Sequence, residues 1–60
     1  MKKLYPPIGY KFESDVNADS EEEVLDVIKG LSDELYERAK KHTHKERLQM
    51  LKENGFEVKN

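Results

Sequence analysis

Residues 20–42, SEEEVLDVIKGLSDELYERAKKH, decide the fold. The stretch begins with a capping-box pattern, because the Ser20 hydroxyl can accept from the Glu23 amide while the Glu23 carboxylate reaches back to the Ser20 amide. Apolar residues then recur every three or four positions, as on one face of an amphipathic helix. They are Val24, Ile28, Leu31, Leu35 and Ala39. The pattern predicts a helix over residues 20–42.

Gly30 stands inside this pattern, where a glycine costs about 1 kcal/mol relative to alanine. The apolar repeat keeps its phase across Gly30, which favours one continuous helix. In the alternative, a first helix ends near Lys29 and a second begins at Ser32. The continuous helix requires ordinary helical torsion angles at Gly30, and not the left-handed conformation of a helix stop.

A further helix is expected after His42, because the first apolar repeat is lost there. Residues 43–46, THKE, repeat the capping-box pattern. A new apolar stripe follows, made of Leu48, Met50 and Leu51. The stripe stops at Asn54-Gly55, a typical end of a helix. These features predict a helix over residues 44–54.

Two other segments alternate between apolar and polar residues, as half-buried strands do. One covers residues 8–13, and its apolar members are Ile8, Tyr10 and Phe12. The other covers residues 56–59 at the end of the chain. Proline cannot donate to a strand ladder, so Pro6-Pro7 is expected to hold residues 1–7 in an extended arm before the first strand.

The order of these elements predicts one small α+β domain over residues 1–60. A helix over residues 20–54 would be about 50 Å long at about 1.5 Å per residue, whereas a six-residue strand spans about 20 Å. The chain is therefore expected to turn near Thr43, so that a long and a short helix form a hairpin. The N-terminal and C-terminal strands then pair as a two-stranded antiparallel sheet on this hairpin. The expected core aromatics are Tyr10, Phe12 and Phe56.

Composition limits the function classes. The chain has 60 residues and no cysteine. A core of this size supplies about 3–5 kcal/mol, so association with a second copy or with a larger protein is expected. No nucleophile paired with a base, no phosphate-binding loop and no convergent set of metal ligands is evident in the sequence. We therefore expect no enzyme, no cofactor and no metal site.

The sequence also bears on location. No apolar run approaches the about 20 residues that cross a bilayer. The first residues, MKKLYPP, lack the apolar segment of a signal peptide. A cytoplasmic protein without membrane contact is expected.

Charge is strongly segregated along the chain. Ten of the 13 acids lie in residues 13–37, whereas residues 38–47 carry five bases and two histidines. Such a surface steers partners of complementary charge, which predicts a small regulator or adaptor that binds a larger protein. The candidate contacts are Tyr36, Arg38, Lys40, Lys41, Lys45 and Arg47.

In a purely structural interpretation, these bases offset the helix dipole and pair with acids four residues earlier. The expected pairs are Glu34 with Arg38 and Glu37 with Lys41.

Part of the chain resembles winged helix-turn-helix proteins. Residues 43–58, THKERLQMLKENGFEV, resemble the recognition helix and first wing strand, and residues 32–39, SDELYERA, resemble the preceding helix. The resemblance implies a helix that enters the major groove of DNA. It implies nucleic-acid contacts at His44, Lys45, Arg47 and Gln49. The net charge of −2 favours protein binding over this alternative, because nucleic-acid binders are more often basic.

Overall fold

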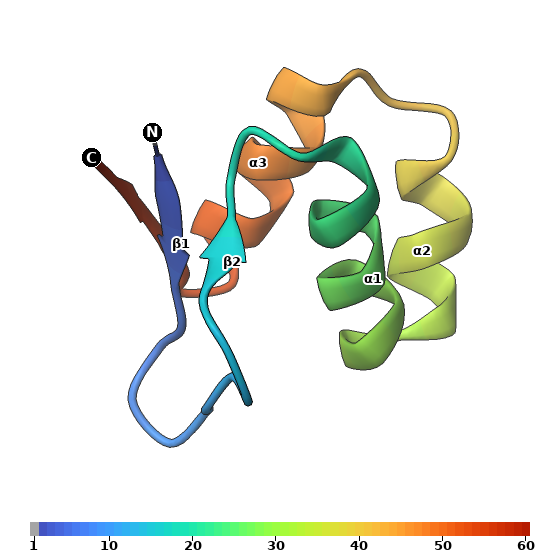
Figure 1. Ribbon diagram of the computed structural model, residues 1–60. Helices are drawn as coiled ribbons and strands as arrows, with labels where there is room; N and C mark the ends of the chain where they lie inside the picture. Colours follow the sequence, from blue (N-terminus) through green and yellow to red (C-terminus); the bar gives the residue numbers. More distant parts are fainter. Residues whose placement is uncertain (1) are drawn as a thin grey trace.

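The two ends of the chain meet in one antiparallel sheet (Figure 1). The computed structural model describes residues 2–60. The central strand is β1 (Lys3–Tyr5), and the edge strands are β2 (Val16–Asn17) and β3 (Glu57–Lys59). The sheet therefore has three strands and not the predicted two.

Leu4 lies at the centre of the inner face of the sheet. Its residue is 3% exposed, and it lies opposite Val16 on one side and Val58 on the other. Because successive side chains of a strand point to opposite faces, Lys3 and Tyr5 lie on the outer face and are exposed.

Three helices lie on the inner side of the sheet: α1 (Glu21–Leu31), α2 (Asp33–Ala39) and α3 (His44–Glu53). α1 packs against β2, and α3 packs against β3. α2 packs on α1, on the side away from the sheet. The α+β class is as predicted, with three helices instead of a helical hairpin.

The core lies between the sheet and the layer of α1 and α3. Ile28 and Leu51 are each 1% exposed, and Phe56 is 2% exposed. The ring of Phe56 stacks on that of Phe12 with 6.0 Å between centroids, and the Tyr10 ring meets the Phe56 ring edge-on at 5.5 Å. The expected packing role of the three aromatics is confirmed.

The predicted strand at residues 8–13 is wrong. Pro7 to Tyr10 form a tight turn, in which the Tyr10 amide donates to the Pro7 carbonyl at 3.1 Å. Gly9 has a φ of 90°, as the third residue of a type II turn requires. Tyr10 and Phe12 alternate with polar residues because both rings fold back onto the core, and not because they lie in a ladder.

The predicted arm over residues 1–7 contains the central strand. Pro6-Pro7 follows β1 instead of preceding a strand, because proline ends a ladder as readily as it delays one. β2 forms between the predicted strand at residues 8–13 and the predicted helix at residues 20–42. Just beyond β2, the Ala18 amide donates to the Lys2 carbonyl at 3.0 Å. Met1, the first residue of the predicted arm, lies outside the described residues.

The predicted continuous helix over residues 20–42 is broken at Ser32. This residue has extended backbone angles, φ −166° and ψ 135°. Its hydroxyl accepts from the Leu35 amide at 3.5 Å and so caps α2. The alternative with a second start at Ser32 is correct, although the first helix continues past Lys29 to Leu31.

Both predicted capping patterns bind amides at a helix start. The Ser20 hydroxyl accepts from the Glu23 amide at 3.3 Å. The predicted return bond to Glu23 is replaced, because the Ser20 amide donates to the Asn17 carbonyl at 3.1 Å. Thr43 and Glu46 form a complete reciprocal box: the Glu46 amide donates to the Thr43 hydroxyl at 3.3 Å, and the Thr43 amide donates to the Glu46 carboxylate at 2.8 Å. The box satisfies two amides that have no partner within the helix.

α3 ends at the predicted Asn54-Gly55 stop. Gly55 has a φ of 94° and its amide donates to the Lys52 carbonyl at 3.1 Å. The Phe56 amide donates to the Leu51 carbonyl at 3.0 Å, which completes a Schellman motif. The motif leads the chain directly from α3 into β3.

Gly30→Ala is expected to stabilise the protein by up to about 1 kcal/mol, because alanine lowers the entropy of the unfolded chain. Gly30 lies within α1 without a positive φ, and an added Cβ would lie 3.9 Å from the Tyr10 hydroxyl. Urea denaturation measures the change. Gly55→Ala is the matched control and should destabilise, because a Cβ there meets Pro7 at 3.0 Å. A lower midpoint for Gly30→Ala would contradict the helical assignment.

Candidate functional site

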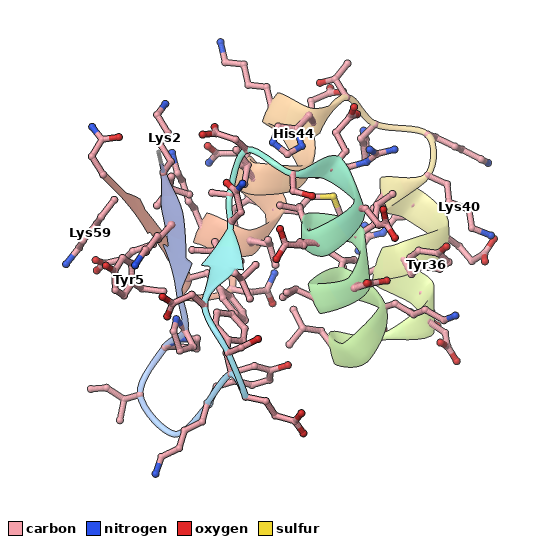
Figure 2. The ribbon with its side chains drawn as sticks, in the orientation of Figure 1. Lys2, Tyr5, Tyr36, Lys40, His44 and Lys59 are labelled. Carbon is pink, nitrogen blue, oxygen red and sulfur yellow. The ribbon has the colours of Figure 1, made fainter. Side chains whose placement is uncertain are left out.

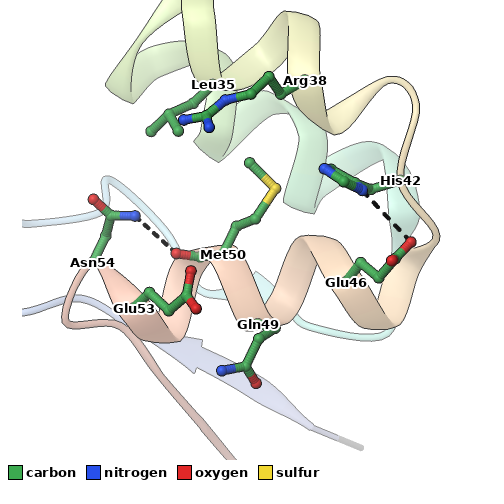
Figure 3. A pocket seen from close by; sticks show the side chains of 8 residues that line it. All are labelled: Leu35, Arg38, His42, Glu46, Gln49, Met50, Glu53 and Asn54. Atoms are coloured by element: carbon green, nitrogen blue, oxygen red, sulfur yellow. Dashed lines mark hydrogen bonds and ion pairs between the residues drawn. The ribbon is translucent and has the colours of Figure 1, made fainter.

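α2 and α3 leave a groove of about 510 Å³ between them, called here the α2–α3 groove (Figure 3). The two helices diverge because α2 packs outward on α1 while α3 packs inward on β3. Residues spaced by three or four positions line each wall, as expected for one face of a helix. The lining residues are Leu35, Arg38, His42, Glu46, Gln49, Met50, Glu53 and Asn54.

The apolar part of the α2–α3 groove is formed by Leu35 from α2 and Met50 from α3. Both side chains pack against the core and are only partly buried. The Met50 side chain extends toward Leu35 and Arg38 across the groove (Figure 3). Methionine is flexible and polarizable, so it adapts to side chains of different shape. An apolar side chain from outside could pack here.

Several polar groups of the groove are already engaged. Nδ1 of His42 lies 3.6 Å from a Glu46 carboxylate oxygen, and the same carboxylate accepts from the Thr43 amide. The Asn54 side-chain amide donates to the Met50 carbonyl at 2.8 Å. These contacts hold the side chains of His42, Glu46 and Asn54 in place, so these three groups have little hydrogen-bonding capacity left for a ligand.

Arg38 and Glu53 are the charged groups left open at the groove. Both residues are exposed, and neither takes part in the ion pairs found among residues 2–60. The Arg38 guanidinium projects over Leu35 and Met50 (Figure 3). Guanidinium can hold a carboxylate with two parallel hydrogen bonds. The groove therefore offers an apolar surface beside an open cationic fork.

Acidification is expected to weaken the start of α3 through Glu46. Hydrogen bonding from the Thr43 amide holds the pKa of Glu46 below its ordinary value of 4.5. Because the pKa is lower in the folded state, this carboxylate's contribution is fully present above about pH 4.5 and is lost as the pH falls through the folded-state pKa. Urea midpoints of the wild type and of Glu46→Gln should therefore converge in acid. A gap that stays constant with pH would contradict this origin.

Tyr36 and Lys40, two of the residues predicted to bind a partner protein, contact each other in the structure. Nζ of Lys40 lies 2.9 Å from a Glu37 carboxylate oxygen and 4.8 Å from the centroid of the Tyr36 ring (Figure 2). Nζ of Lys29 lies 5.6 Å from the same centroid. Tyr36 is partly buried against the core, so this ring serves the packing of α2 on α1. The Glu37 hydrogen bond raises the pKa of Lys40.

The ion pairs expected from spacing take a different form. Glu37 pairs with Lys40, three residues later, instead of with Lys41. The expected pair of Glu34 with Arg38 is also missing from the ion pairs of residues 2–60. Lys41, in the turn after α2, is exposed and takes no part in the ion pairs found among residues 2–60.

Arg47, which the sequence predicts as a contact for a partner protein, instead holds parts of the fold together. Its Nε donates to the Ala39 carbonyl at 2.8 Å, near the end of α2. A terminal nitrogen lies 3.6 Å from a Glu21 carboxylate oxygen of α1, and the Arg47 side chain is 12% exposed. Arg47 thus joins three helices, whereas its neighbour Lys45 is exposed.

His44 also has a structural position. Its Nε2 donates to the Ala18 carbonyl at 2.7 Å, with the ring tautomer assigned from that acceptor. Its Nδ1 is buried without a hydrogen-bond partner. Of the four residues implied by the winged-helix resemblance, only Lys45 and Gln49 are exposed, and Gln49 faces the α2–α3 groove.

Arg47→Ala is expected to cost about 1–3 kcal/mol, because a hydrogen bond from a charged donor is lost, although the Ala39 carbonyl keeps its bond from the His42 amide at 3.0 Å. Lys45→Ala is the matched control on the same helix and should leave the urea midpoint unchanged. Chemical denaturation of both variants measures the difference. Equal urea midpoints for the two variants would contradict a stabilising role of Arg47 and would leave it available as a surface base.

Leu35, Met50 and Glu53 are groove residues that the sequence did not assign to a site. Leu35 and Met50 belong to apolar stripes, and a stripe alone does not show which of its members stay open. The only available signal is the break at Ser32, because it turns α2 away from the axis of α1.

Comparison of the chain with protein families, with curated proteins and with solved structures gives no match. Within residues 2–60, no helix is long and apolar enough to cross a membrane. The same residues contain no cluster of three or more His, Cys, Asp or Glu side chains that could hold a metal ion.

Proposed function

We propose that the protein is a non-catalytic binding module of the cytoplasm that docks an acidic, amphipathic segment of a larger protein in the α2–α3 groove. The observation that carries the proposal is the open Arg38 guanidinium above the apolar surface of Leu35 and Met50. A regulator or adaptor needs no chemistry of its own at such a site. Its effect comes from occupying the partner's segment.

The chemistry of the groove selects the occupant. An apolar side chain of the partner would cover Leu35 and Met50, and a carboxylate nearby would pair with Arg38. Lys41 in the turn after α2 and Lys45 in the first turn of α3 add positive charge and would steer an acidic segment toward the groove. Glu53 at the other end favours one basic residue in the same segment.

Nucleic acid is the weaker candidate for the same surface. Phosphate binding gains from many free bases, whereas Arg47 and His44 already hold backbone carbonyls. Glu46 and Glu53 line the groove and would repel a backbone that carries a negative charge at every nucleotide, whereas a peptide can place a basic residue beside Glu53. These positions support a protein segment over a duplex.

The test is selection from a random peptide display library, followed by titration of a selected peptide. We expect enriched sequences with a large apolar residue next to Asp or Glu. Arg38→Glu should weaken the peptide about tenfold or more, since a charge-assisted hydrogen bond contributes more than one decade. Lys11→Glu, a charge reversal in the loop between β1 and β2, is the matched control and should bind normally.

Two outcomes would overturn the proposal. One is selected peptides whose affinity is the same for wild type and Arg38→Glu while circular dichroism shows both folded. The other is micromolar binding of random duplex DNA at physiological salt with a steep salt dependence. The second outcome would favour the winged-helix alternative.

A further inference from the structure

The outer edge of β3 has no strand beside it. β3 pairs with β1 on one side, and the strand order β2-β1-β3 ends there. Figure 1 shows β3 at the margin of the molecule, with no helix or loop beyond it. An edge strand presents unpaired amides and carbonyls that can accept another strand. The chain thus offers a ready backbone edge at residues 57–59.

The side chains on this edge complement each other. Glu57 and Lys59 are exposed, and Val58 between them is partly buried. Because side chains alternate along a strand, Glu57 and Lys59 share the outer face, while Val58 lies opposite Leu4 on the inner face. An acid and a base flank one apolar residue symmetrically.

We propose that two copies of the chain pair through their β3 edges, antiparallel, about a two-fold axis at Val58. In this register Glu57 of each copy lies opposite Lys59 of the other, and the two Val58 residues face each other. Directly opposite residues in an antiparallel pair interact most strongly. Two cross-strand ion pairs then form on the outer face, and the three-stranded sheet becomes six-stranded. Such an interface is isologous and closed, so it makes dimers and not fibres.

The contacts within one chain leave these charges available. Nζ of Lys59 lies 3.1 Å from the Glu57 carboxylate, with the two side chains 62% and 63% exposed. Lys59 also lies 5.7 Å from the centroid of the Tyr5 ring (Figure 2). Both contacts are on the solvent side, so the charges can turn to a second copy at little cost. None of the residues of the α2–α3 groove lies in β3, so this inference is independent of the proposed function.

The test uses two charge reversals and their mixture. Glu57→Lys gives an edge with two bases, and Lys59→Glu gives an edge with two acids. Each variant alone should self-associate about tenfold more weakly than the wild type, because both cross-strand pairs become repulsive. An equimolar mixture should form a heterodimer at least as strong as the wild-type dimer. The double variant Glu57→Lys/Lys59→Glu should restore self-association.

Sedimentation equilibrium over a range of concentrations measures each association, and circular dichroism confirms that every variant is folded. Amide signals of residues 57–59 should also shift with wild-type concentration in NMR spectra. A wild type that stays monomeric at millimolar concentration would refute the dimer. Unchanged association of the single variants, or a mixture no stronger than either variant alone, would refute the register.

Discussion

Phe56→Ala is expected to leave most of the protein unfolded at 25 °C. Phe56 is 2% exposed and contacts both other aromatics of the core. Removing a buried phenylalanine side chain costs about 3–5 kcal/mol, and a domain of this size has only about 3–5 kcal/mol in total. The substitution also removes the apolar side chain that follows the Gly55 stop of α3, where a Schellman motif commonly has an apolar contact.

Circular dichroism and amide dispersion in NMR spectra measure the unfolded fraction. Tyr5→Ala is the matched control, because Tyr5 is 42% exposed on the outer face of the sheet. It should keep the folded spectrum. A cooperatively folded Phe56→Ala with a wild-type urea midpoint would show that the aromatic cluster does not hold the sheet to the helices.

Ile28→Ala should destabilise the protein by about 2–5 kcal/mol, the range for a buried aliphatic truncated to alanine. Ile28 is 1% exposed in the middle of α1, whereas Ile8 is 105% exposed at the turn between β1 and β2. Ile8→Ala deletes the same atoms from a side chain that is exposed to solvent and not packed in the core. It should leave the urea midpoint unchanged.

The pair of isoleucines separates the two interpretations of residues 8–13. If these residues formed a half-buried strand, truncation of Ile8 would cost stability comparable to that of other strand residues. If they form the turn seen here, only Ile28→Ala matters. Equal losses for both variants would contradict the turn.

Helix starts and stops were predictable from sequence because their signals are local. Ser20, Thr43 and Asn54-Gly55 act through hydrogen bonds to residues within one turn. The break at Ser32 has the same kind of signal, a hydroxyl three residues before an apolar position. The sequence nevertheless favours a continuous helix, because the apolar repeat keeps its phase across the break. The repeat persists because α1 and α2 pack against each other through apolar side chains.

The strands were much harder to predict. β1 has three residues and β2 has two, which is too short for alternation to be recognised. The alternation at residues 56–59 was recognisable, and β3 forms there at Glu57–Lys59. Tyr10 and Phe12 alternate over a longer stretch, and their pattern is the same for a strand and for a loop folded onto the core. Strand pairing depends on partners far apart in sequence, and no local residue pattern specifies those partners.

The candidate site was predicted in part. Arg38 lies at the α2–α3 groove, and Lys41 and Lys45 are exposed. The base-rich segment predicts Arg47 as a contact, and the winged-helix resemblance implies His44 as one. Their acceptors, the carbonyls of Ala39 and Ala18, become neighbours only in the folded chain. The groove itself required the relative direction of α2 and α3, which no spacing in the sequence shows.

The most direct test of the proposed function is methyl NMR of Met50 with a selected acidic peptide. The chain has two methionines, so methyl labelling gives two signals, and Met50→Leu assigns the one that matters. Met50 forms the apolar surface of the α2–α3 groove, and its methyl signal should shift on titration of the wild type. In Arg38→Glu the same shift should need about tenfold more peptide. A Met50 methyl signal that does not move while the peptide binds would contradict docking in the groove.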